Sequence, residues 1–273
     1  RGVAGLRINP GNIGSKQKVK EVVTAAKDRA VPIRIGVNSG SLEKSLLEKY
    51  GTATAEAMVE SALQHVQLLE DLDFPWIKIS LKASDIGRTL KAYQLLAEKV
   101  DYPFHAGITE AGTLLSGSVK SAAGLTLLLG QGLVDTLRVS LTAAPEDEVR
   151  VAYYILASLG IRQRGPNLIS CPVCGRCEVD FPAIAMEIER RLTALEVPLT
   201  VAVMGCMVNG PGEAKEADIG LACGRGVGVI FKRGKLLRKV PEAKIVDEFM
   251  HEVESLAGAF SQEGQADSGK ERQ

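Results

Sequence analysis

Residues 76–85 read Trp-Ile-Lys-Ile-Ser-Leu-Lys-Ala-Ser-Asp, a short apolar run that passes directly into charged and polar residues. Comparable β-rich runs recur toward the amino terminus and further along, and each is predicted to be a strand: Gly5–Asn9, Pro32–Val37, Trp76–Leu81, Pro103–Thr109 and Thr136–Leu141. Stretches with helical periodicity follow these runs: Lys16–Ala30, Thr54–Leu72, Asp85–Val100, Ser116–Gly130 and Pro145–Leu159. This alternation predicts an α/β fold with parallel strands and right-handed crossovers.

The spacing of these units indicates a (β/α)8 barrel of the TIM type, in residues 1–160. Five βα units do not close a barrel of eight. The sheet is therefore either open, or three further units of roughly 90–110 residues precede the chain. Because the chain starts at Arg1 and leads at once into a predicted strand, we expect a fragment that carries the last five units.

Charge and composition limit the classes of partner. The 33 Lys and Arg residues balance the 33 Asp and Glu residues, so we expect neither nucleic acid nor a membrane as a partner. No apolar stretch approaches the roughly 18–20 residues that span a bilayer, which predicts a soluble protein. All five cysteines follow residue 170, and an odd number so placed favours a metal site in a reducing compartment over disulfides.

Polar and cationic side chains accompany the predicted strands at or near their carboxyl ends, where barrel sites form. The candidates for binding an anion are Arg7, Arg34, Asn38, Lys82, Arg138 and Ser140. Each could be a solvated charge at the end of a strand. An anionic ligand explains all of them together, since guanidinium groups match phosphate oxygens in pairs.

A second domain is predicted from residue 161 to 260, after the Gly/Pro/Arg-rich linker Gly160–Asn167. It is expected to be a small α+β domain. The expected β segments are Leu168–Ser170, Leu199–Met204, Asp218–Ala222 and Gly226–Val240, and the expected helices are Phe181–Leu195 and Ala243–Ala257. The polar residues 261–273 lack apolar periodicity, which predicts a disordered tail.

The cysteine spacing leaves three alternatives. Cys171 and Cys174 form a C-x-x-C pair, and Cys206 follows on a glycine-rich loop. A structural zinc site usually closes with a second tight pair, which Cys206 and Cys223 do not provide. A thioredoxin-like redox pair leaves Cys177 and Cys206 unexplained, whereas an iron–sulfur cluster accommodates three thiolates and a replaceable ligand.

The motifs SCPVCGRC (170–177) and GCMVNGPGE (205–213) together resemble the C-terminal domain of the 4-hydroxy-3-methylbut-2-enyl diphosphate synthase family. The resemblance extends from Arg7 to about Glu242, and the barrel segments that carry it stand in the family's order: LRINPGNIG, IRIGVNSGSL, KISLKASD, HAGITEAG and LRVSLT. The N-terminal barrel section of that family has no counterpart here.

The resemblance implies a [4Fe–4S] cluster bound by Cys171, Cys174, Cys206 and Glu213. A carboxylate is a hard and comparatively labile ligand for iron, so Glu213 is expected to yield to a substrate oxygen during catalysis. Cys177 and Cys223 fall outside this ligand set and are interpreted as non-ligands.

The resemblance also implies the reaction and its partners. The expected activity is reductive ring opening and dehydration of 2-C-methyl-D-erythritol 2,4-cyclodiphosphate, with electrons from flavodoxin or ferredoxin. The six anion-binding candidates would hold the diphosphate, Glu110 would be the acid for the departing hydroxyl, and His105 would pack within its strand. A homodimer is expected, in a bacterial cytoplasm rather than a plastid stroma.

Two rival hypotheses remain at this point. One is a zinc-stabilised protein that binds a phosphate ligand and catalyses nothing. The other is a truncated chain that folds poorly and has no activity.

Overall fold

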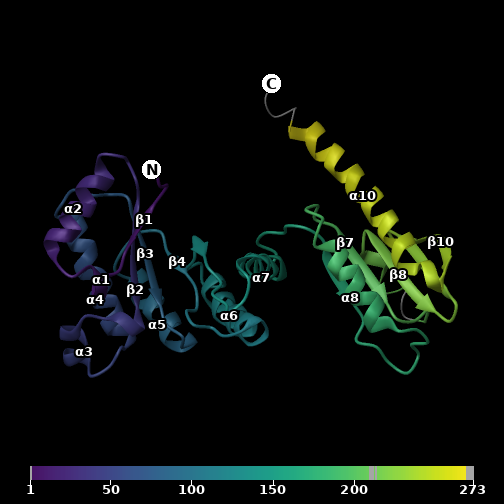
Figure 1. Cartoon of the computed structure of the whole chain (residues 1–273), viewed down its shortest axis with the longest axis horizontal. Helices are drawn as coiled ribbons and strands as arrows, with labels where there is room; N and C mark the ends of the chain where they lie inside the picture. Colours follow the sequence, from purple (N-terminus) through teal and green to yellow (C-terminus); the bar gives the residue numbers. More distant parts are fainter. Residues whose placement is uncertain (1, 209–211, 213, 269–273) are drawn as a thin grey trace. The chain divides into compact units, whose positions relative to one another are not determined.

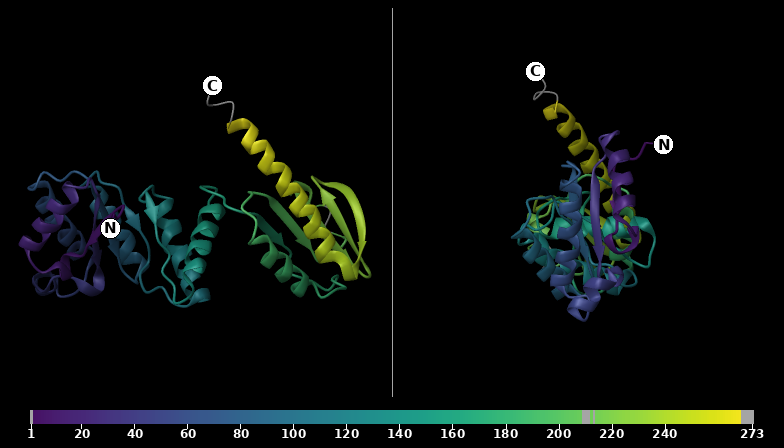
Figure 2. Two further views of the ribbon diagram at one scale, coloured as in Figure 1. Left: turned by 45° about the horizontal axis from the view of Figure 1, so that its top comes forward. Right: turned by 90° about the vertical axis from the view of Figure 1, so that its left-hand side faces the viewer.

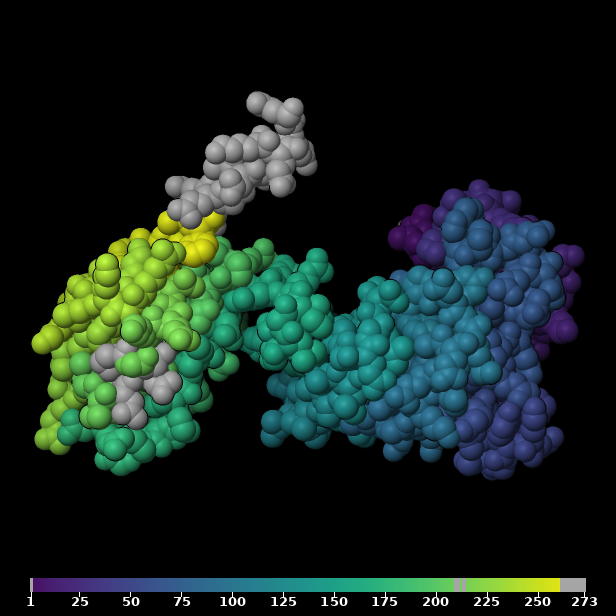
Figure 3. All heavy atoms as spheres, turned by 180° about the vertical axis from the view of Figure 1, so that it is seen from behind, coloured from purple at the N-terminus to yellow at the C-terminus, as the bar shows by residue number. Residues whose placement is uncertain are grey.

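The computed structural model describes residues 2–208, 212 and 214–268, and only the backbone of residues 214 and 261–268. The chain divides into two compact units, Arg1–Leu159 and Gly160–Gln273 (Figure 1). Side chains fill the spaces between the ribbons within each unit (Figure 3). No helix in the described part of the chain is both long and apolar enough to cross a membrane.

Unit 1 alternates strands and helices along the chain (Figure 1). The elements are β1 (Leu6–Ile8), α1 (Pro10–Ile13), α2 (Lys16–Lys27), β2 (Ile33–Asn38), α3 (Lys44–Tyr50), α4 (Ala55–Glu70), β3 (Ile77–Lys82), α5 (Ile86–Ala97), β4 (His105–Ala106), α6 (Leu114–Leu129), β5 (Thr136–Leu137) and α7 (Pro145–Ser158). Strands β1, β2 and β3 pair in parallel, and β4 pairs in parallel with β5. A parallel bridge from Ile79 to Phe104 continues this order from β3 toward β4.

The parallel order of the strands confirms the predicted α/β class. The further expectation, that these are the last five βα units of a barrel, stays a prediction. Two predicted strands are much shorter than expected, because β4 and β5 have only two residues each. The short helix α3 was not predicted from the sequence. Strand residues with odd numbers on β2 and β3, such as Ile35 and Ile79, are fully buried in one core with residues of α2, α4 and α5. The even-numbered residues therefore face the other side of the sheet.

Local capping explains where the helices after two of the strands begin. The Oδ1 atom of Asp85 accepts a hydrogen bond of 2.6 Å from the backbone N–H of Arg88, and it thereby caps α5. The side chain of Thr54 accepts a bond of 3.1 Å from the N–H of Ala57 and caps α4. Both caps begin their helices close to the residues that the apolar periodicity indicated.

Unit 2 is a five-stranded mixed sheet with two helices on one face (Figure 2). Its elements are β6 (Asn167–Ser170), α8 (Phe181–Leu192), β7 (Thr200–Met204), β8 (Ile219–Gly224), β9 (Val227–Lys232), β10 (Lys235–Pro241) and α10 (Ile245–Ser268). Strands β6, β7 and β8 are parallel, and β8, β9 and β10 are antiparallel. Phe181 and Ile188 of α8 share a core with Phe249 and Val253 of α10.

Helix α10 extends into the segment where a disordered tail was predicted. The backbone is helical to Ser268, residues 269–273 lie outside the described residues, and the tail from residue 261 stays a prediction.

Candidate active site

The face of the unit 1 sheet that turns away from the helices is rich in cations. Arg7 lies opposite Arg34 in the strand register, and Arg34 lies opposite Lys78. Further toward the carboxyl ends, Asn38 lies opposite Lys82. Strand alternation therefore places these side chains on one face. We call the set Arg7, Arg34, Lys78, Lys82 and Arg138 the cationic face.

A glycine makes room for the side chain of Arg7. The Nη2 atom of Arg7 donates a hydrogen bond of 2.8 Å to the carbonyl oxygen of Gly36. A Cβ atom on residue 36 would lie 2.2 Å from Nε of Arg7, far inside van der Waals contact. Gly36 is needed because the Arg7 side chain passes over it toward the carboxyl ends of the strands.

Arg138 follows β5 and lies beside a second glycine. Its Nη2 atom donates a hydrogen bond of 3.2 Å to Oγ of Ser140, so the two predicted anion-binding residues are in contact. A Cβ atom on Gly107 would lie 2.4 Å from the carbonyl oxygen of Arg138. The absence of a side chain at residue 107 thus lets the Arg138 segment approach β4 closely.

Lys82 is the most buried cation of this face, with 6% of its surface exposed. Burial, and then repulsion from Arg34, Arg138 and Arg7, lowers the pKa of Lys82 to about 7. Burial, and then repulsion from Arg138, lowers the pKa of Arg7. Burial, and then repulsion from Arg7 and Arg138, lowers the pKa of Arg34 against a smaller opposing effect of Tyr93. Among the described residues, no ion pair includes a member of the cationic face. Repelling cations without a carboxylate partner are the arrangement that an anion stabilises.

His105 on β4 lies within the field of these cations. Burial, and then repulsion from Lys82, Arg34, Lys78 and Arg138, lowers the pKa of His105 to about 3, so the ring is neutral. Its Nδ1 atom is 2.9 Å from Oγ1 of Thr136, and its buried Nε2 has no hydrogen-bond partner in the described part of the chain. Thr136 therefore fixes the Nδ1 side of the His105 ring, and the Nε2 atom stays without a hydrogen bond among the described residues.

Lys78 is the cation that was not selected from the sequence. It lies in register with Arg34 and contributes to the lowered pKa of His105. The signal was present in the alternation of residues 78, 80 and 82, which share one face of β3.

The predicted acid, Glu110, lies in the loop after β4. Its side chain is exposed and its backbone has a φ of 53°, which is uncommon for a residue other than glycine. The position after a strand end agrees with a place at the edge of the site, and its role as an acid stays a prediction.

The cysteine loops of unit 2 follow the ends of two neighbouring parallel strands, β6 and β7. The backbone N–H of Gly205 donates a hydrogen bond of 3.1 Å to Sγ of Cys171. A Cβ atom on Gly205 would lie 3.4 Å from Sγ of Cys171 and 3.3 Å from Sγ of Cys177. Two sulfur atoms therefore gather at the end of β7, and an N–H group is directed at one of them.

The structure describes three of the four predicted ligands, and the ligand set stays a prediction. Cys171 and Cys206 are half-buried, whereas Cys174 is exposed. Glu213 lies outside the described residues. Within the described ranges, no group of three or more His, Cys, Asp or Glu side chains is arranged to hold a metal ion. Cys223, interpreted as a non-ligand, is buried, and burial raises the pKa of its thiol to about 12.

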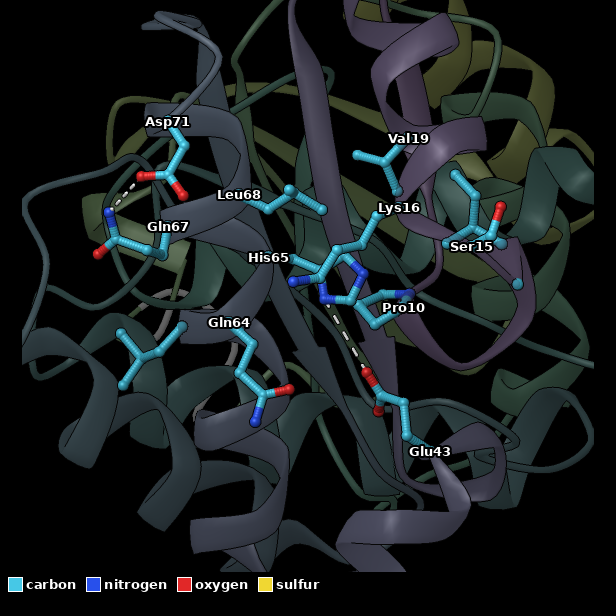
Figure 4. A pocket seen from close by; sticks show the side chains of 13 residues that line it. Pro10, Ser15, Lys16, Val19, Glu43, Gln64, His65, Gln67, Leu68 and Asp71 are labelled. Atoms are coloured by element: carbon cyan, nitrogen blue, oxygen red, sulfur yellow. Dashed lines mark hydrogen bonds and ion pairs between the residues drawn. The ribbon is translucent and has the colours of Figure 1, made fainter.

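A separate pocket of about 610 Å³ lies between α1, α2 and α4 (Figure 4). His65 points toward Glu43 there, with Nδ1 3.9 Å from Oε1 (Figure 4). Burial lowers the pKa of His65 and outweighs the opposing effect of Glu43. None of the residues predicted to bind substrate or metal lines this pocket.

Two family models match the two units. The GcpE TIM-barrel domain matches residues 1–153, and the GcpE protein C-terminal domain matches residues 167–255. This chain belongs to the GcpE family. The matches confirm that residues 1–153 belong to a TIM-barrel domain and that a C-terminal domain follows it.

Curated members of the family cover nearly the whole chain. A protein of Geobacter sulfurreducens is 62% identical over 255 residues, which are 93% of this chain and 72% of that protein. A protein of Maridesulfovibrio salexigens is 60% identical over 254 residues, 93% of this chain and 71% of that protein. A protein of Bacillus cereus is 53% identical over 272 residues, 100% of this chain and 74% of that protein. All three are named 4-hydroxy-3-methylbut-2-en-1-yl diphosphate synthase (flavodoxin).

Proposed function

We propose that this chain is an iron–sulfur oxidoreductase that converts 2-C-methyl-D-erythritol 2,4-cyclodiphosphate to 4-hydroxy-3-methylbut-2-enyl diphosphate. Its curated relatives carry the name of that synthase. The observation that carries the proposal is the cationic face, because a cyclic diphosphate supplies the anionic oxygens that these groups lack. The zinc-stabilised alternative has no support in the family matches.

In this proposal the diphosphate binds to Arg7, Arg34, Lys82 and Arg138, and Asn38 and Ser140 contribute neutral donors. The hydrogen bonds of Arg7 to Gly36 and of Arg138 to Ser140 hold two guanidinium groups in place before the substrate arrives. Such preorganisation reduces the entropy lost on binding.

Lys82 would take up a proton as the substrate binds. Its lowered pKa follows from burial among cations, and a bound phosphate reverses the repulsive part of that effect. A protonated Lys82 then pairs with the phosphate, while His105 stays neutral and adds no charge to the site.

Glu110 is proposed to protonate the hydroxyl group that leaves as water. Its exposed position after β4 allows it to exchange protons with solvent between turnovers. This role requires that the substrate hydroxyl lies toward the loop 107–112.

The residues of unit 2 fit an iron–sulfur cluster by the chemistry of their donors. Thiolates are the usual ligands of such clusters, and an N–H group directed at a ligand sulfur tunes the potential. The Gly205 N–H directed at Cys171 provides this arrangement, and residue 205 has no side chain to crowd the sulfur atoms. Cys171, Cys174, Cys206 and Glu213 would hold a [4Fe–4S] cluster. When bound, the cluster supplies the one-electron transfers that the ring opening requires.

The remaining parts of the proposal concern partners and location. The relatives' names specify flavodoxin, so we propose flavodoxin as the electron donor, with ferredoxin as the second candidate. A homodimer in the bacterial cytoplasm completes the proposal.

Metal analysis after anaerobic purification tests the proposal. We expect a brown protein with about four irons per chain and broad absorbance near roughly 400 nm. One zinc per chain with no iron, after reconstitution with iron and sulfide, would contradict it.

A further inference from the structure

Cys177 lies beside Cys171, although it stands outside the proposed ligand set. The Sγ atoms of the two residues lie 3.3 Å and 3.4 Å from the same point, the position that a Cβ atom of Gly205 would take. The Cγ atom of Phe181 lies 3.2 Å from the same point. The two thiols are thus neighbours across the small residue at the end of β7.

The loop that joins the two cysteines brings Cys177 to this position and leaves Cys174 outside. The backbone N–H of Cys177 donates a hydrogen bond of 3.0 Å to the carbonyl oxygen of Cys174, which closes a turn. Val173, in the same loop, has a φ of 58°. Cys174 is exposed, whereas Cys177 is half-buried and its thiol donates a bond of 3.3 Å to the carbonyl oxygen of Val179.

We propose that Cys171 and Cys177 form a reversible disulfide when the chain holds no cluster. The inference deepens the proposed function, on which it rests for the role of Cys171 as a ligand. In this proposal Cys177 does not bind iron, and its thiol forms a disulfide with a ligand cysteine when iron is absent.

The oxidant is a low-molecular-weight disulfide such as glutathione disulfide. The thiolate of Cys171 attacks one sulfur of glutathione disulfide, which forms a mixed disulfide and releases one glutathione. The thiolate of Cys177 then attacks Sγ of Cys171 and releases the second glutathione. The protein loses two electrons and two protons, and both protons reside on the two glutathione thiols.

The disulfide has two consequences for the chain. It keeps Cys171 from oxidation to sulfinic acid, which is irreversible for most proteins, whereas a disulfide is reduced by thiols. It also withholds one ligand from iron until a reductant restores the thiol. Loading of the cluster therefore depends on the thiol–disulfide balance.

Peptide mapping of the cluster-free full chain tests the proposal. The protein is incubated anaerobically with glutathione disulfide, and the remaining thiols are alkylated before digestion and mass spectrometry. We expect a Cys171–Cys177 cross-link, with alkyl groups on Cys174, Cys206 and Cys223. A cross-link from Cys171 to Cys174 or Cys206, or alkylation of all five cysteines, overturns the proposal.

Two variants separate the pair from its neighbours. Cys177→Ser should form no cross-link and should keep glutathione on Cys171, because the thiolate that displaces it is gone, and Cys177→Ala serves the same purpose if the serine variant does not fold. Cys174→Ser is the matched control in the same loop, and the Cys171–Cys177 cross-link should persist in it. Loss of the cross-link in the Cys174 variant would overturn the proposal.

The mass of the intact chain gives a second measurement. After treatment with glutathione disulfide, the native chain should carry no glutathione on Cys171, because Cys177 displaces it, whereas Cys177→Ser should retain it. Glutathione retained on Cys171 in both chains contradicts the proposal. Because the mapping uses no iron, its outcome is independent of whether the chain binds a cluster.

Discussion

Arg7 of β1 donates a hydrogen bond of 2.8 Å to the carbonyl oxygen of Gly36 on β2, across the space that a side chain at residue 36 would fill. The variant Gly36→Ala should therefore displace the Arg7 guanidinium, since the new Cβ would lie 2.2 Å from Nε. We expect affinity for pyrophosphate, measured by calorimetry, to fall by about tenfold, which corresponds to about 1.4 kcal/mol.

Gly87→Ala on α5 is the matched control for that substitution. A Cβ atom there meets only Oδ1 of Asp85, at 3.6 Å, which is ordinary contact. Pyrophosphate affinity should be unchanged in this variant. An unchanged affinity in Gly36→Ala as well would remove Arg7 from the anion site.

Lys82 should make the stability of unit 1 depend on pH. Its pKa in the folded chain is about 7, below the usual 10.5, so between these values the unfolded chain binds the extra proton. The free energy of unfolding should therefore rise with pH across this window, and the full cost of burying the cation is present below pH 7. Lys82→Met should stabilise the chain at pH 6 by up to about 5 kcal/mol, since one pKa unit is worth about 1.36 kcal/mol.

Denaturation in urea at pH 6 and pH 10, in a buffer free of phosphate, measures this effect. The gain from Lys82→Met should shrink at pH 10. Lys91→Met on the exposed side of α5 is the control and should change stability little at either pH, because its ion pair with Glu56 is exposed. A destabilised Lys82→Met variant at pH 6 would contradict the electrostatic account of the cationic face.

Lys78 should also contribute to anion binding, although less than its neighbours nearer the carboxyl ends. Lys78→Gln keeps the length of the side chain nearly unchanged and removes the charge. We expect the KM for the cyclic diphosphate to rise about three- to tenfold, or about 0.7–1.4 kcal/mol, with kcat little changed. A steady-state comparison with Lys91→Gln checks the value, and equal KM values in the two variants would exclude a role for Lys78.

The two kinds of cluster ligand should respond differently to substitution. Glu213→Ala should retain part of the iron and lose turnover, because three thiolates still hold the cluster while the exchangeable ligand is gone. Cys171→Ala should lose most of the iron. Iron analysis and absorbance of the two variants side by side distinguish the roles, and full turnover in Glu213→Ala would end the idea of an exchangeable ligand.

Much of unit 1 was predictable because its pattern is local. Apolar residues such as Ile33, Ile35, Ile77 and Ile79 alternate with polar ones, so strand positions and the buried face follow from period two. The site cations were found for the same reason, since carboxyl ends of parallel strands meet at one edge. Lys78 was missed because it lies inside β3, four residues before Lys82, where only the parity of the strand marks it.

Other features depend on tertiary contacts and were not predictable. The shortness of β4 and β5 reflects which backbone groups find partners, which the apolar runs do not determine. The cysteine spacing suggested Cys174 as the neighbour of Cys171, yet Cys174 is exposed and the sulfur atom of Cys177 lies beside Gly205. The lowered pKa of His105 likewise arises from burial, and then from cations that other segments bring close.

Turnover under anaerobic conditions tests the central claim most directly. The full chain, reconstituted with iron and sulfide, is incubated with 2-C-methyl-D-erythritol 2,4-cyclodiphosphate and reduced flavodoxin, and products are identified by mass spectrometry. The account predicts 4-hydroxy-3-methylbut-2-enyl diphosphate, with formation lost in Arg138→Glu at the same substrate concentration. A chain that carries a full complement of iron, binds the cyclic diphosphate and forms none of this product would contradict it.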